Sequence, residues 1–148
     1  LDYSQFPDND EARVSDLANN LYSLRTRLRA VETSFNSAAT GSAELLHAVQ
    51  TLKGDWRRRT REVFEKWSRL ESADSLLDAW RNQPELSRDL QQQLDRLQHD
   101  GAGSAIDETG TQGLYALLGS IKGLLESMEK LQESMNSINW AQYSTPRF

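Results

Sequence analysis

The chain of 148 residues contains no cysteine. This absence excludes disulfide bonds, thiolate catalysis and zinc sites that use cysteine ligands. It leaves the cellular compartment open, because exported bacterial proteins can also lack cysteine. A chain of this length can bury a hydrophobic core without disulfides or metals, so we expect a single domain over residues 1–148.

A long hydrophobic run is also missing. No stretch of the sequence approaches the ~18 apolar residues that a membrane-spanning helix needs. The chain begins at Leu1 without an initiator Met and without the charged-then-apolar pattern of a signal peptide. We therefore expect a soluble chain with no transmembrane segment or signal peptide, with the cytoplasm slightly favoured. We interpret it as a fragment or a processed form, from which an address signal can be missing.

An excess of basic residues is absent as well. The chain has 17 Lys and Arg against 22 Asp and Glu, which gives a formal net charge of -5. A protein whose surface is built to neutralise phosphates has the opposite balance, so nucleic acid is not the expected partner.

An apolar stripe over residues 114–138 is the strongest positive signal. Its members alternate at spacings of three and four, which is a heptad pattern: Leu114, Leu117, Ile121, Leu124, Met128, Leu131, Met135 and Ile138. A helix of this length, roughly 37 Å, buries such a stripe only against other long helices.

A second stripe with the same spacing lies near the other end of the chain. It consists of Val14, Leu17, Leu21, Leu24, Leu28, Val31 and Phe35. Two matched stripes predict an all-α fold, an antiparallel bundle of three to four long helices with coiled-coil-like heptad seams. If the helices alternate in direction, the first helix begins where the last one ends.

Helix boundaries follow from capping and turn residues. Asp8, followed by Glu11, resembles a capping box, so the first helix should run from Asp8 to about Asn36. After a small polar connection, the second helix either continues through Trp80 or bends near residues 72–75, and we favour one long, bent helix. A shorter and more polar helix should span Pro84 to His99.

Residues 100–113 contain four glycines, which predicts a flexible loop, with Thr111 capping the last helix. The segments 1–7 and 140–148 are aromatic tails without helical periodicity. At the end shared by the first and last helices, Trp140 and Tyr143 should either form a cap or serve as a partner-binding epitope.

Four arginines crowd one part of the second helix, at Arg57, Arg58, Arg59 and Arg61. They project in several directions around the helix axis. Three interpretations remain open: a solvated face paired with nearby carboxylates, a docking site for an acidic protein, or a site for phosphate or anionic lipid. Arg59 follows Trp56 by three residues in the buried phase, so it either snorkels out of the core or marks an opening in the bundle.

Motifs for catalysis or cofactors are weak. Glu44 and His47 form a single Glu-x-x-His, whereas carboxylate-bridged di-iron bundles use two copies. The glycines of residues 101–106 match a dinucleotide fingerprint only in part and lack a preceding strand. We therefore expect no cofactor, no metal and no enzyme activity. Gly119 and Gly123 predict a close approach on a second face of the last helix.

The function expected from these features is a non-catalytic protein-protein interaction, scaffolding or oligomerisation module. Its partner is another protein or a second copy of itself, with an anionic lipid surface as a further alternative. The candidate partner-binding residues are Arg57, Arg58, Arg59, Arg61, Trp140 and Tyr143. The alternative function is that of an exported or effector-type helical protein acting on a host protein or a membrane surface.

Overall fold

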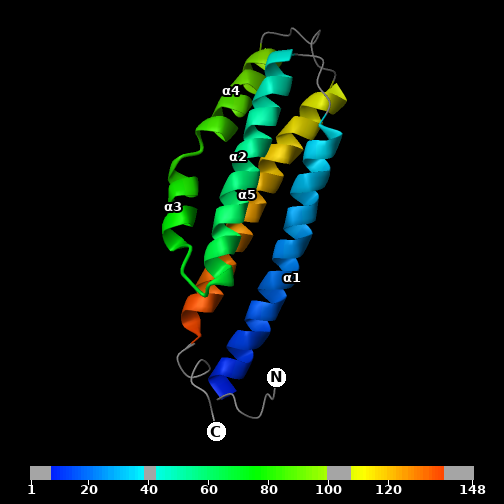
Figure 1. Ribbon diagram of the computed structural model, residues 1–148. Coiled ribbons are helices and arrows are strands. Elements are labelled where there is room, and N and C mark those ends of the chain that lie inside the picture. The colour runs from blue at the N-terminus through cyan, green and yellow to red at the C-terminus, as the bar shows by residue number, and fades with distance from the viewer. Residues whose placement is uncertain (1–7, 39–42, 100–107, 139–148) are drawn as a thin grey trace.

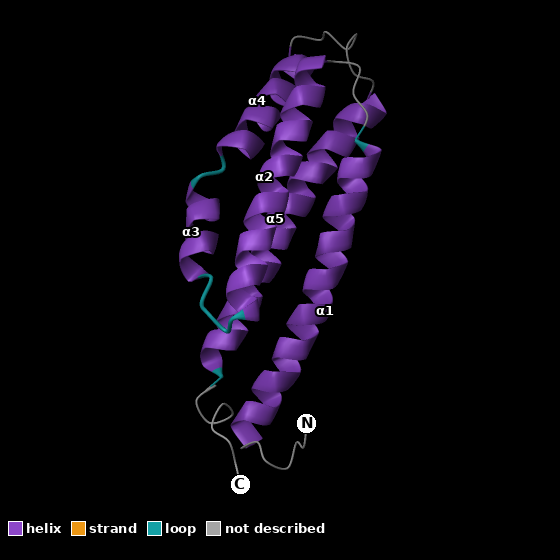
Figure 2. Ribbon diagram, in the orientation of Figure 1, coloured by secondary structure: helices purple, strands orange, loops and turns teal. Residues whose placement is uncertain are grey.

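The computed structural model describes residues 8–38, 43–99 and 108–138, and within these ranges the secondary structure is exclusively helical (Figures 1 and 2). The helices are α1 (Asp8–Ser37), α2 (Ala43–Ser68), α3 (Asp74–Asn82), α4 (Glu85–His99) and α5 (Glu108–Ser137). The all-α bundle is confirmed. None of the described helices is long and apolar enough to cross a membrane.

α1 and α2 run in opposite directions, α3 and α4 both run parallel to α1, and α5 runs parallel to α2 (Figure 1). After α2 returns antiparallel to α1, α3 and α4 follow one another along the far side of α2, and α5 runs back through the middle. The start of α1 therefore lies beside the end of α5. Arg13 Nη1 donates a hydrogen bond to the Ser137 carbonyl (2.6 Å), and Asn20 Nδ2 donates one to Ser134 Oγ (2.6 Å). The predicted tail contacts of Trp140 and Tyr143 lie outside the described residues.

The stripe of α5 forms the axis of the core. Leu114, Leu117, Leu124 and Met128 are fully buried, and Met135 is half-buried. α5 packs most extensively against α1, while α2 packs mainly against α4. The short helices contribute more to the core than their polar sequences suggest. Buried members from these two helices are Leu77, Trp80, Leu90 and Leu94.

Tyr115 joins α5 to α4 at the rim of the core. Its hydroxyl donates a hydrogen bond to Asp95 Oδ1 (2.5 Å). This hydrogen bond, with smaller contributions from desolvation and from the carboxylate charge, raises the pKa of Tyr115 to about 12, because the phenol must keep its proton to donate.

The continuous second helix that we favoured is wrong, because α2 ends at Ser68. Leu70 adopts a left-handed conformation (φ 56°), its N–H donates to the Trp67 carbonyl, and the Glu71 N–H donates to the Lys66 carbonyl (2.9 Å). These two bonds form a Schellman motif, which normally uses glycine at the left-handed position. Without a glycine, the sequence carries no signal for this stop.

A buried amide holds the chain reversal in place. Gln132 of α5 is 2% exposed, and its Oε1 accepts hydrogen bonds from Trp67 Nε1 and from the Ala73 N–H, both at 2.8 Å. Its Nε2 donates to Asn136 Oδ1 (2.9 Å). One side chain thus joins the end of α2 and the start of α3 to α5.

The predicted loop over residues 100–113 is too long. α5 begins at Glu108, so Thr111 lies inside the helix and does not cap it. The helix tolerates its early glycines because Leu114 and Leu117, both fully buried, anchor the following turns in the core.

The stripe of α1 is only partly covered. Leu24, Val31 and Phe35 are buried, Leu17 is half-buried, and Leu21 is 51% exposed. α1 extends beyond the end of α2 (Figure 1), so its first half has only α5 as a long neighbour. α5 is the main neighbour of α1 among the described helices.

Replacing Gln132 by Leu should lower the free energy of unfolding by about 2 to 4 kcal/mol, because it leaves the Trp67 indole and the Ala73 amide without an acceptor. Urea unfolding measures the loss, and Gln92→Leu, the same change at an exposed position of α4, is the control. Equal stability of the Gln132 variant and the native chain would show that the reversal does not depend on this amide.

Alanine substitutions test whether Gly119 and Gly123 each allow a close approach to α5. A Cβ at Gly123 would lie 2.5 Å from Arg27 Nη1, whereas a Cβ at Gly119 would meet nothing within 4 Å. Gly119→Ala should therefore stabilise the chain by about 1 kcal/mol through helix propensity, and Gly123→Ala should stabilise it less because Arg27 must move. A Gly119→Ala chain that is less stable in urea unfolding would contradict the interpretation that Gly119 faces open space.

Candidate partner-binding groove

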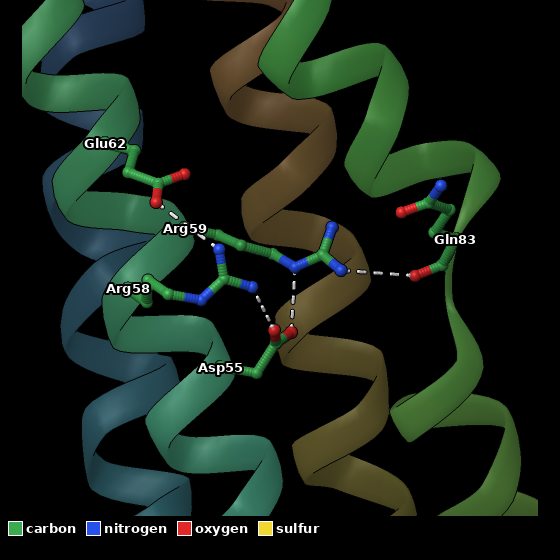
Figure 3. Close-up of polar contacts among 5 residues, drawn as sticks. All are labelled: Asp55, Arg58, Arg59, Glu62 and Gln83. Carbon is green, nitrogen blue, oxygen red and sulfur yellow. Dashed lines mark hydrogen bonds and ion pairs between the residues drawn. The ribbon is translucent and has the colours of Figure 1, made fainter.

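The arginine run of α2 divides into two pairs that face different parts of the bundle. Arg58 and Arg59 share the carboxylate of Asp55, at 2.8 and 2.9 Å, and Arg58 also reaches Glu62 at 3.3 Å (Figure 3). The hydrogen bond to Asp55 is the main reason that the pKa of Arg58 is raised further above its usual value. For Arg58 and Arg59, the structure agrees with one of the three interpretations, a face on which the arginines pair with nearby carboxylates.

Arg59 takes part in the packing of α2 against the segment around α3. Its side chain is 17% exposed, its Nη2 donates to the Gln83 carbonyl (3.5 Å), and its guanidinium lies 5.9 Å from the centre of the Trp80 ring. It therefore links α2 to the connection between α3 and α4 (Figure 3). Of the two alternatives, Arg59 snorkels along the core and does not mark an opening.

Arg57 and Arg61 point to the other side of α2, where they line a groove between α1 and α2 with a volume of about 480 Å³. They are one helical turn apart, so they share a face. Both are exposed, and neither has an ion-pair partner among the described residues. The groove thus carries two guanidinium groups that are free to bind an anion.

The wall of the α1/α2 groove is apolar. Leu28 of α1 and Phe64 of α2 line it and are half-buried, while Trp56 lies deeper at 6% exposure. Phe35 packs against Trp56 with 5.4 Å between the ring centres. The described lining also includes Glu32, Thr60, Glu65 and Ser68.

Two buried polar atoms at the α1/α2 groove have no hydrogen-bond partner. They are Trp56 Nε1 and Thr60 Oγ1, on side chains that are 6% and 7% exposed. An unpaired buried polar group costs about 1 to 3 kcal/mol, so two of them in one place are a measurable weakness of the fold. Elsewhere among the described residues, buried side-chain nitrogens and oxygens are paired.

The apolar surface continues from the α1/α2 groove along α1. Leu21 precedes Leu28 by two helical turns and projects from the same side of α1. Arg25 lies between them on that side of α1 and is exposed. The charged residues that line the groove balance one another, with Arg57 and Arg61 against Glu32 and Glu65.

A second groove, of about 500 Å³, separates α5 from α3 and α4. Arg81 at its rim bonds Glu129 at 2.5 Å and approaches Asp78 at 3.8 Å, and Arg88 and Lys122 also line it. Its lining residues leave no buried polar side-chain atom unpaired among those described. It is therefore the weaker candidate for a binding site.

The remaining sequence candidates do not join the α1/α2 groove. Glu44 and His47 are exposed on α2 beside α4, and the described residues contain no group of three or more His, Asp or Glu side chains able to hold a metal ion. Trp140 and Tyr143 lie outside the described residues. The sequence analysis missed Thr60 and Phe64, although their spacing from Arg57 by three and seven residues places all three on one side of α2.

Thr60→Val should stabilise the free protein by about 1 kcal/mol, because it replaces a buried hydroxyl that has no partner with a methyl group of similar size. Urea unfolding measures the change. Thr51→Val is the matched control, since the Thr51 hydroxyl is exposed and donates to the His47 carbonyl (2.9 Å). A destabilised Thr60→Val chain would show that the hydroxyl is hydrogen-bonded in solution.

Comparisons with protein-family models, with curated proteins and with solved structures found no match for this chain. No relative therefore supplies a function, and the candidate function follows from the geometry of the α1/α2 groove.

Proposed function

We propose that the protein is a non-catalytic protein-protein interaction module and that it binds its partner in the α1/α2 groove. The observation that carries this proposal is the placement of two unpaired buried polar atoms, Trp56 Nε1 and Thr60 Oγ1, beside two arginines without ion-pair partners. Trp56 Nε1 and Thr60 Oγ1 are buried, so the exposed Arg57 and Arg61 are the groups that a bound partner can contact directly.

The form of the α1/α2 groove favours a protein partner over a membrane surface. Leu28 and Phe64 are half-buried and come from the two helices that line the groove. A helix or an extended segment fits between two helices and buries both residues. A coiled-coil-like scaffolding or oligomerisation role belongs to the same proposal, with the uncovered stripe of α1 as the contact surface.

A catalytic role is not part of the proposal. The described lining of the α1/α2 groove contains no histidine, and the Thr60 hydroxyl has no base within hydrogen-bonding distance. A hydroxyl needs such a base to act as a nucleophile. The groups present are suited to binding.

Affinity capture with three forms of the full chain tests the proposal. The native chain is compared with Arg57→Gln/Arg61→Gln, which alters the groove, and with Arg58→Gln/Arg88→Gln, which removes the same charge elsewhere. Proteins from the cells that produce this chain should bind the native and control forms and be lost from the groove variant by about ten-fold, as expected when charge-assisted contacts are removed. Equal capture by all three forms, or no capture, would contradict the proposal.

A further inference from the structure

We propose that two copies of this chain associate through the outer face of α1, with their two α1 helices antiparallel. The outer face is the side of α1 opposite its buried stripe, and it consists of Glu11, Ser15, Ala18, Tyr22, Arg25 and Arg29. The inference develops the oligomerisation role within the proposed function and rests on it for that role alone, because none of these residues lines the α1/α2 groove.

The residues of the outer face are spaced for the pairing of two helices. Successive members alternate at spacings of four and three, which are the spacings of the a and d positions in a coiled coil. All of them are exposed, whereas Leu24 and Val31 on the opposite side of α1 are 4% and 0% exposed. α1 thus carries a second heptad seam, roughly 27 Å long, which the described helices of the same chain leave uncovered.

The middle of the outer face is apolar. Tyr22 is 74% exposed, and Leu21, which borders the face, is 51% exposed. These are two of the four large hydrophobic side chains that are exposed among the described residues, and they are adjacent on one helix. Ala18, one turn before Tyr22, has a small side chain and leaves space beside the ring.

A two-fold axis that crosses α1 near Asn20 makes the outer face complementary to itself. In this register, Ala18 of each copy lies opposite Tyr22 of the other, so a large side chain covers a small one. Leu21 meets Leu21 of the second copy at the edge of the contact. Because the contact is two-fold symmetric, each unlike pairing occurs twice.

Charge selects the antiparallel direction. Among the described residues, Glu11 and Arg29 have no ion-pair partner within the chain. The two-fold register places Glu11 of each copy opposite Arg29 of the other, and Arg25 opposite the Ser15 hydroxyl. A parallel pairing would place like charges against one another, which is unfavourable. The next layer outward combines Glu32 with an aspartate at position 8 of the sequence, so the favourable contact ends at Arg29.

The separation of the charges favours a second copy over an anionic lipid surface. Arg25 and Arg29 lie at one end of the outer face and Glu11 lies at the other. A lipid surface of one charge would attract the arginines and repel the glutamate. An antiparallel copy presents the opposite charge to both ends.

Sedimentation equilibrium of the full chain, from about 10 µM to about 1 mM, tests the inference, because a contact of this size is expected to be weak. The native chain should form dimers. Tyr22→Ala should weaken the association by about ten-fold, since the symmetric contact contains the substitution twice. Leu46→Ala, which removes another exposed apolar side chain, from α2, is the control and should change the affinity by less than about two-fold. A chain that stays monomeric, or one that both substitutions weaken equally, would overturn the inference.

Charge reversal tests the antiparallel register. Glu11→Lys and Arg29→Glu should each weaken self-association by about ten-fold, because each creates two pairs of like charges. An equimolar mixture of the two variants should associate with about the native affinity, since opposite charges then face one another again, and this recovery would show that both variants are folded. Arg96→Glu, a reversal at an exposed position of α4, is the control. Single reversals without effect, or a mixture that does not recover, would contradict the register.

A cross-link tests the position of the axis. Because the chain has no cysteine, Leu21→Cys introduces a unique thiol. A short bis-maleimide should link this thiol to the same thiol of the second copy, whereas Leu46→Cys should give no linked dimer above background. Equal cross-linking of the two variants would reject an axis beside Leu21.

The results separate this inference from binding in the α1/α2 groove. If the chain is monomeric but Arg57→Gln/Arg61→Gln still loses captured proteins, the dimer is overturned and the groove remains the binding site. If the chain dimerises as described but captures no other protein, the dimer is supported and binding in the groove is contradicted. Capture of another protein that Tyr22→Ala abolishes, by a chain that stays monomeric, would assign the outer face to that protein and overturn the inference.

Discussion

The arrangement of the bundle depends on the position at which α2 ends. The left-handed conformation of Leu70 stops the helix, and Gln132 then fixes the returning chain by binding the Trp67 indole and the Ala73 amide. Because α2 is shorter than α1 and α5, it covers only part of the stripe of α1. After this stop, α3 and α4 lie on the side of α2 away from α1 (Figure 1). One local backbone conformation thus ends α2 and lets the chain return along its far side.

The helical class, the first helix, the helix after Pro84 and the antiparallel alternation could be predicted from the sequence, because apolar spacing and capping residues act locally. The end of α2 could not be predicted. Its C-terminal motif uses Leu70 where glycine is usual, and its stabilising amide lies 59 residues away from Ala73 in the chain. The start of α5 was also misjudged, since burial of Leu114 and Leu117 outweighs the low helix propensity of the glycines before them.

Only part of the candidate site could be predicted from the sequence. The run of arginines pointed to α2, but its four members have different roles that depend on what each one faces. Arg59 belongs to the core packing of Trp80, whereas Arg57 and Arg61 border the groove. The sequence does not distinguish Thr60 from other threonines, because only the structure shows that its hydroxyl is buried and unpaired. Helical periodicity shows which residues share a face, but it does not show which neighbour covers that face.

The contact between α1 and α5 also has a consequence for biosynthesis. Arg13 bonds to the Ser137 carbonyl, 124 residues later, and the stripe of α1 finds its main cover in the last helix of the described chain. During synthesis, α1 must therefore remain without this cover until α5 has left the ribosome, with its leucines open to other apolar surfaces. The packing of α1 can therefore be completed only after α5 has been made.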